Sequence, residues 1–144
     1  VKSLKDKNIN VGLIFCLPMI GDMAYYRKCL SLIKEMDIDD NILIVQKEIP
    51  NGFEVWKLSD LFIRPTSTDI EGISVKEALY CGTAAIASDV CTRPKEVILF
   101  KNRNYEDLEM KVLDFYKNRN QYQSIKISFV EHTVQQLLDI YKSL

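Results

Sequence analysis

The stretch Leu61–Val90 reads LFIRPTSTDIEGISVKEALYCGTAAIASDV and contains the clearest pattern of secondary structure in the sequence. A short, largely apolar segment, Leu61–Arg64, leads into a polar loop, and a second apolar segment, Ala84–Ser88, follows later. Between them, Gly72–Tyr80 has the composition of a helix and stops at a cysteine–glycine pair. The pattern predicts a strand–helix–strand unit whose helix begins at the carboxyl end of a parallel strand. Unpaired N–H groups and the helix dipole favour an anion there.

Strand and helix patterns alternate along the rest of the chain. Further strands are expected at Val11–Cys16, Asn41–Gln46 and Glu96–Phe100, and further helices at Asp22–Met36, Phe53–Leu58, Tyr105–Asn118 and Ser128–Leu144. Val1–Asn8 looks like the tail of a helix, so we expect a preceding strand and most of that helix to be missing. The alternation predicts an α/β fold, a Rossmann-like parallel sheet flanked by helices, in a single domain over residues 1–144.

Composition excludes several classes of protein. The 144 residues include 19 Lys and Arg against 20 Asp and Glu, so the net charge of -1 predicts no nucleic-acid partner. No apolar run is long enough to span a bilayer, and the sequence has no signal-peptide pattern. The four cysteines have no C-x-x-C spacing and there is one histidine, so we expect neither disulfides nor a metal site.

An acid, a glutamate and a Gly-Thr pair stand at a characteristic spacing within Leu61–Val90. The residues concerned are Asp69, Glu77, Ala78, Gly82, Thr83 and the strand end Ala87-Ser88-Asp89. In this arrangement the chain resembles the retaining glycosyltransferases of group 1 (glycosyltransferase family 4), which include glycogen and sucrose synthases. Nearly the whole chain resembles the nucleotide-sugar-binding C-terminal domain of their two-domain B-type fold, with its first strand missing.

The resemblance implies an enzyme that transfers a sugar from a nucleoside-diphosphate sugar, with retention, to a glycan or lipid-linked acceptor. The sequence around Arg64-Pro65-Thr66 resembles the corresponding sequences of bacterial enzymes that synthesise surface polysaccharides. The implied location is cytoplasmic, and the full-length enzyme could associate peripherally with a membrane. The acceptor would bind through an N-terminal domain that this chain lacks, so we expect the chain to be inactive alone.

Two acids carry the expected chemistry. By resemblance, Asp69 is the catalytic-site acid that accepts hydrogen bonds from donor-sugar hydroxyls, and Glu77 accepts them from the ribose. The structural alternatives are a helix cap or loop acid for Asp69 and a solvent-facing helical residue for Glu77. Asp69 also departs from the family's usual glutamate and is one methylene shorter.

The other expected donor contacts surround the start of the motif helix. Its first-turn N–H groups would hold the diphosphate, and a glycine there allows close approach of the backbone to a ligand. Arg64 could reach a phosphate or form a surface salt bridge, and Thr83 could contact the donor or only turn the chain. These donor-binding candidates are Gly72, Ile73, Ser74, Val75, Glu77, Arg64 and Thr83. We expect no cofactor and no metal, since dipoles and N–H groups can stabilise the leaving diphosphate.

Two other classes share the predicted fold. A nucleotide-sugar epimerase would need further histidine and acidic residues in its cleft. A receiver-like signalling module would need clustered acids after the first strand, where Pro18, Met19 and Ile20 stand instead. The missing first strand also predicts that the strand at Val11 either pairs directly with that at Leu61 or has the gap filled by another chain.

Overall fold

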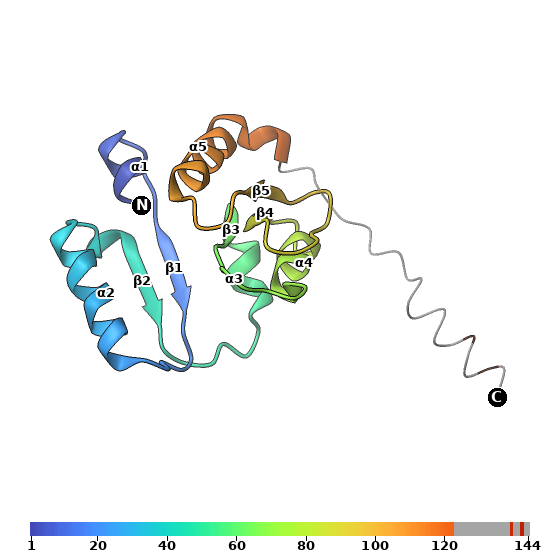
Figure 1. Cartoon of the computed structure of the whole chain (residues 1–144), viewed down its shortest axis with the longest axis horizontal. Helices are drawn as coiled ribbons and strands as arrows, with labels where there is room; N and C mark the ends of the chain where they lie inside the picture. Colours follow the sequence, from blue (N-terminus) through green and yellow to red (C-terminus); the bar gives the residue numbers. More distant parts are fainter. Residues whose placement is uncertain (123–138, 140–141, 143–144) are drawn as a thin grey trace. The chain divides into compact units, whose positions relative to one another are not determined.

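The computed structural model describes residues 1–122, 139 and 142, which divide into two compact units, Val1–Pro50 and Asn51–Leu144 (Figure 1). Unit 1 is Val1–Pro50 and unit 2 is Asn51–Leu144. Both contain parallel strands and helices, as the alternating pattern predicts. The helix expected at Ser128–Leu144 lies outside the described residues.

Unit 1 contains two parallel strands and two α-helices. In chain order its elements are α1 (Lys2–Asp6), β1 (Leu13–Cys16), α2 (Met23–Glu35), a 3-10 turn η1 (Asp39–Asn41) and β2 (Ile42–Val45). Asp22 caps α2, because its carboxylate accepts the N–H groups of Ala24 and Tyr25, each at 2.9 Å. The predicted start of this helix is therefore confirmed.

The strands of unit 1 are less buried than their apolar run predicts. β1 and β2 pair in parallel, with Leu13 opposite Ile42. The side chains of Ile14 and Phe15 remain 44% and 40% exposed, and Leu43 is exposed as well. Burial of these strands on both faces is thus not observed.

Unit 2 carries the stretch from which the fold was predicted. Its elements are α3 (Phe53–Lys57), β3 (Leu61–Arg64), α4 (Ile73–Tyr80), β4 (Ala84–Ser88), β5 (Ile98–Phe100) and α5 (Tyr105–Tyr122). The three strands are parallel in the order β3-β4-β5 (Figure 1). Non-helical backbone at Asn118 interrupts α5 where the predicted helix ends, but helical structure resumes as far as Tyr122.

The core of unit 2 has two parts, because alternate residues of β4 point to opposite faces of the sheet. On one face, α4 packs against β4; this cluster is Val75, Leu79, Ala85, Ala87, Val97 and Phe62. On the other face, α5 packs against the sheet; this cluster includes Ala84, Ile86, Phe100, Phe115, Leu108 and Val112. β4 is buried along its whole length.

The strands form two hydrogen-bonded sheets among the described residues, β1-β2 and β3-β4-β5. Each of these sheets lies within one unit. The direct pairing of β1 with β3 and the strand supplied by another chain both stay predictions. Among the described helices, none combines the length and the apolar character that a bilayer span requires.

Candidate functional site

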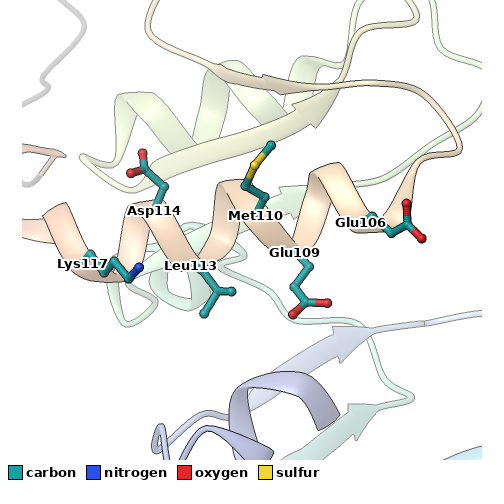
Figure 2. A pocket seen from close by; sticks show the side chains of 6 residues that line it. All are labelled: Glu106, Glu109, Met110, Leu113, Asp114 and Lys117. Carbon is teal, nitrogen blue, oxygen red and sulfur yellow. The ribbon is translucent and has the colours of Figure 1, made fainter.

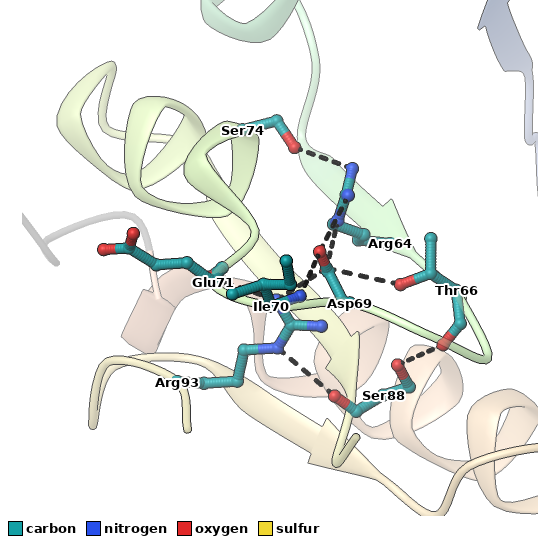
Figure 3. Close-up of polar contacts among 8 residues, drawn as sticks. All are labelled: Arg64, Thr66, Asp69, Ile70, Glu71, Ser74, Ser88 and Arg93. Carbon is teal, nitrogen blue, oxygen red and sulfur yellow. Dashed lines mark hydrogen bonds and ion pairs between the residues drawn. The ribbon is translucent and has the colours of Figure 1, made fainter. Parts of the chain in front are cut away.

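The carboxyl ends of β3 and β4 lie at the same edge of the unit 2 sheet, because neighbouring strands are parallel. Arg64 ends β3 and Ser88 ends β4. The buried Ser88 hydroxyl donates to the Thr66 carbonyl at 2.6 Å, which fixes the loop that leads toward α4 (Figure 3). In an open parallel sheet, ligands bind beyond this edge.

Asp69 lies at the centre of a polar cluster at this edge (Figure 3). Arg64 holds it with two hydrogen bonds, from Nε to Oδ2 at 2.6 Å and from Nη2 to Oδ1 at 3.2 Å. Arg93 adds a third, from Nη1 to Oδ2 at 2.9 Å, and the side chain of Asp69 is only 9% exposed. The hydrogen bond from Arg64, followed by that from Arg93, holds the pKa of Asp69 far below its usual range. Asp69 is therefore ionised throughout the neutral range.

The oxygens of Asp69 are fully occupied. Besides the two arginines, the Ile70 N–H donates to Oδ1 at 3.1 Å and the Thr66 hydroxyl lies 3.4 Å from Oδ2. A carboxylate offers about four acceptor positions. A direct bond from Asp69 to a sugar hydroxyl would thus require one of these contacts to be exchanged.

Arg64 links this cluster to the start of α4. Its Nη1 donates to the hydroxyl of Ser74, in the first turn of the helix, at 3.1 Å. The Arg64 side chain is 30% exposed, and its hydrogen bond to Asp69 raises its pKa. Arg64 therefore forms the salt bridge that was one of its two alternatives, and its contact with a phosphate stays a prediction.

The start of α4 has no side-chain cap. Gly72 precedes it in the left-handed conformation, with φ 67°. The N–H groups of Ile73 and Ser74 donate no hydrogen bond within the part of the chain that the structure describes, whereas that of Val75 donates to the Gly72 carbonyl at 2.8 Å. Of the three amides expected to hold a diphosphate, the first two therefore have no partner among the described residues.

The remaining two candidates lie in different places. Glu77 is half-buried, one turn after Ser74 on the same face of α4, and its carboxylate makes no hydrogen bond or ion pair with a described residue. Thr83 is buried just before β4, and its hydroxyl donates to the Trp56 carbonyl at 2.6 Å. Thr83 thus lies at the amino end of the strand, away from the Asp69 cluster.

Sequence reasoning missed Arg93. Its side chain is 0% exposed, and besides Asp69 it donates from Nε to the Ser88 carbonyl at 3.3 Å. Nη2 is buried and has no hydrogen-bond partner among the described residues. The position of Arg93 in the sequence could have predicted this contact. Arg93 follows β4, which pairs in parallel with the strand that ends at Arg64, and the loops after two such strands meet at one edge of the sheet.

A separate cavity of about 320 Å³ lies along the surface of α5 (Figure 2). Its lining residues all belong to that helix: Glu106, Glu109, Met110, Leu113, Asp114 and Lys117. It includes no member of the Asp69 cluster. Within the described ranges, no group of three or more histidine, cysteine or acidic side chains is placed to hold a metal ion.

Comparison with known proteins identifies the family. Residues 1–128 match the family described as "Glycosyl transferases group 1". The chain belongs to this family. The match confirms the predicted resemblance to group 1 glycosyltransferases. Membership of this family implies that a nucleotide sugar is the donor.

A solved structure supports the fold of this group 1 chain. It is similar to the sucrose-phosphate synthase of Thermosynechococcus elongatus, with a TM-score of 0.63 and 15% identity, over 99% of this chain and 48% of the synthase. The chain thus spans about half the length of that synthase. The likeness confirms the predicted α/β fold, half of a two-domain B-type glycosyltransferase. No curated protein matches the sequence.

Proposed function

We propose that unit 2 carries the donor site of a retaining glycosyltransferase, which transfers a sugar from a nucleoside-diphosphate sugar to a glycan or lipid-linked acceptor. The observation that carries the proposal is the uncapped start of α4 beside the cationic side chain of Arg64. Glu77 lies one turn further on the same face. A cytoplasmic role in bacterial surface polysaccharide synthesis fits this reaction.

In this proposal the donor diphosphate lies at the start of α4. The N–H groups of Ile73 and Ser74 and the helix dipole favour its negative charge, and Arg64 adds a full positive charge beside them. The same groups would stabilise the charge that develops on the diphosphate as it leaves. This chain therefore supplies leaving-group stabilisation from its own N–H groups and guanidinium.

Glu77 is proposed to bind the ribose. A carboxylate can accept hydrogen bonds from two neighbouring hydroxyls, and the half-buried Glu77 has no competing partner in the described chain. Asp69 contributes in this proposal by fixing Arg64, because its oxygens are already occupied. The geometry favours neither the epimerase nor the receiver-like alternative, and the family match supports the transferase.

The proposal is tested by calorimetric titration of the 144-residue chain with UDP, GDP and ADP in the absence of metal. We expect one of the three to bind, and Glu77→Ala to weaken that binding about tenfold or more. A hydrogen bond to a charged group contributes about 1.5–3 kcal/mol, and about 1.4 kcal/mol corresponds to a factor of ten.

The matched control is Glu106→Ala, which removes an acid from the first turn of α5 instead. Its affinity should equal that of the wild type. Wild-type chain that binds none of the three nucleotides would overturn the proposed donor site, and an unchanged affinity in Glu77→Ala would remove Glu77 from it. We also expect the chain alone to transfer no sugar, because the acceptor-binding half is needed for proximity.

A further inference from the structure

We propose that Arg93 is a positioning residue of the donor site, which leaves the Asp69–Arg64 pair with an excess positive charge and holds Arg64 in its orientation toward the diphosphate. The inference rests on the proposed function. It assigns to Arg93 an effect on anion binding that acts through Asp69 and Arg64 rather than through a contact with the donor.

The two arginines share Asp69 but differ in access. Both donate to Oδ2, Arg64 at 2.6 Å and Arg93 at 2.9 Å. The Arg64 side chain is 30% exposed and that of Arg93 is 0% exposed. Of these two arginines, only Arg64 is therefore accessible to a ligand. Arg93 can affect the ligand only through its contact with Asp69.

The charges in the cluster do not balance. One carboxylate faces two guanidinium groups and the positive end of α4, so the cluster carries a surplus positive charge. Glu71, whose carbonyl Arg93 contacts, is paired through its side chain with Lys76 and adds no net charge. Asp89, which follows Ser88, accepts the Asn102 N–H and makes no hydrogen bond or ion pair with either arginine. Without Arg93, the Asp69–Arg64 pair would carry no net charge. Arg93 thereby preserves the charge that an anion at the helix start would meet.

Arg93 also holds the turn that begins α4. A Cβ atom on Gly72 would lie 2.0 Å from Arg93 Nη1, so the guanidinium rests directly against this glycine. The same nitrogen lies 3.4 Å from the Glu71 carbonyl, and Nε reaches Ser88 at the end of β4. Arg93 thus ties the end of a strand, the Asp69 loop and the helix start together.

The buried Nη2 atom supports a role beyond packing. It makes no hydrogen bond within the described residues, and a buried donor without a partner is costly. An apolar side chain of similar length would fill the same space without that cost. A charge at this position is therefore better explained by its effect on the neighbouring Asp69–Arg64 pair.

The test uses inorganic pyrophosphate and the nucleoside diphosphate that binds best, titrated into wild-type chain, Arg93→Gln and Arg93→Lys. Arg93→Gln should weaken pyrophosphate binding roughly fivefold or more, the lower end of typical coupling between sites. It should also reduce the salt dependence of binding and shift the Arg64 ¹⁵Nε resonance in the free protein. Arg93→Lys, which keeps the charge, should lose less. Arg119→Gln removes one charge from α5 as a control and should bind like the wild type.

The outcomes separate this inference from the proposed function. If the wild type binds and both Arg93 variants bind equally well, the positioning role is wrong and the donor site stands. If Arg93→Gln weakens the diphosphate and its parent nucleoside by the same factor, Arg93 is only structural and the inference is again overturned. Failure of the wild type to bind any diphosphate overturns the donor site itself. Should Arg93→Gln not fold, Arg93→Met, which removes the charge and keeps an unbranched side chain, carries the test, with an unchanged pyrophosphate affinity and Arg64 resonance as the refuting result.

Discussion

The strands β4 and β1 are both apolar runs, yet only β4 is buried. All five residues of β4 are buried, whereas Ile14 and Phe15 of β1 are 44% and 40% exposed. β4 has a strand on each side and clusters of apolar residues on both faces, and β1 pairs with β2 alone among the described strands. An apolar run therefore indicates that a strand is suited to burial. Whether the strand is buried depends on the strands and helices that pack against it.

Truncation of one isoleucine in each strand measures the difference in burial directly. Ile86 of β4 is fully buried and Ile14 of β1 is not. Ile86→Ala should lower the free energy of unfolding by about 2–5 kcal/mol, because it leaves a cavity as well as losing apolar burial. Ile14→Ala should cost under about 1 kcal/mol, measured by urea denaturation of the same chain. Equal losses would show that β1 is as well packed as β4.

Two glycines of unit 2 differ in the same way in what surrounds them. Gly72 and Gly82 both have positive φ, at 67° and 82°, but a Cβ on Gly82 would meet no atom within 4 Å. Gly82→Ala should cost about 1–2 kcal/mol from backbone strain alone. Gly72→Ala should cost about 1–3 kcal/mol more, because its Cβ collides with the buried Arg93 guanidinium. Thermal unfolding would measure both, and equal costs would mean that Arg93 gives way freely.

The helix caps give a smaller test across the two units. Asp22 caps α2 in unit 1, and in unit 2 the Asn104 side chain accepts the Asp107 N–H at 2.9 Å at the start of α5. Replacing either residue by alanine should cost about 1 kcal/mol. Hydrogen exchange should locate the lost protection in α2 for Asp22→Ala and in α5 for Asn104→Ala. Loss spread over the whole chain from either variant would show that both units unfold together.

Acid should weaken unit 2 through Asp69. Its pKa is lowered in the folded protein, so its stabilising effect is present above the ordinary carboxyl pKa of about 3.9 and is lost as pH falls through the lower folded value. Asp69→Asn should be less stable than the wild type at pH 7, and the difference should shrink below about pH 4. Urea denaturation across this range measures it, with the exposed Asp60→Asn as control. A difference that grows on acidification would contradict the arrangement.

Local sequence signals predicted much of the fold. Leu61–Arg64 and Ala84–Ser88 are strands with the predicted bounds, because turn residues mark both ends of each. The strand predicted from Val11 begins only at Leu13, and the one predicted from Asn41 begins after the 3-10 turn Asp39–Asn41. Ends set by pairing with a neighbouring strand are not encoded in the local pattern.

The site was harder to predict than the fold. The spacing within one strand–helix–strand unit brought Arg64, Asp69 and Ser74 together correctly. It could not show that Arg93, 24 positions after Asp69, folds back onto it. Nor could it distinguish Thr83, whose place in the motif is close but whose side chain lies at the other end of β4. Contacts between loops depend on tertiary packing, which no local spacing records.

The small alanine side chains of β4 set the distance between α4 and the sheet. Ala85 and Ala87 lie under Val75 and Leu79, so α4 rests close to the sheet. Larger side chains there would lift the helix, and with it Ser74 would move away from Arg64. The methyl groups of Ala85 and Ala87 in the core therefore determine how close Ser74 lies to Arg64. Variation at these positions would retune the site without altering any residue that faces solvent.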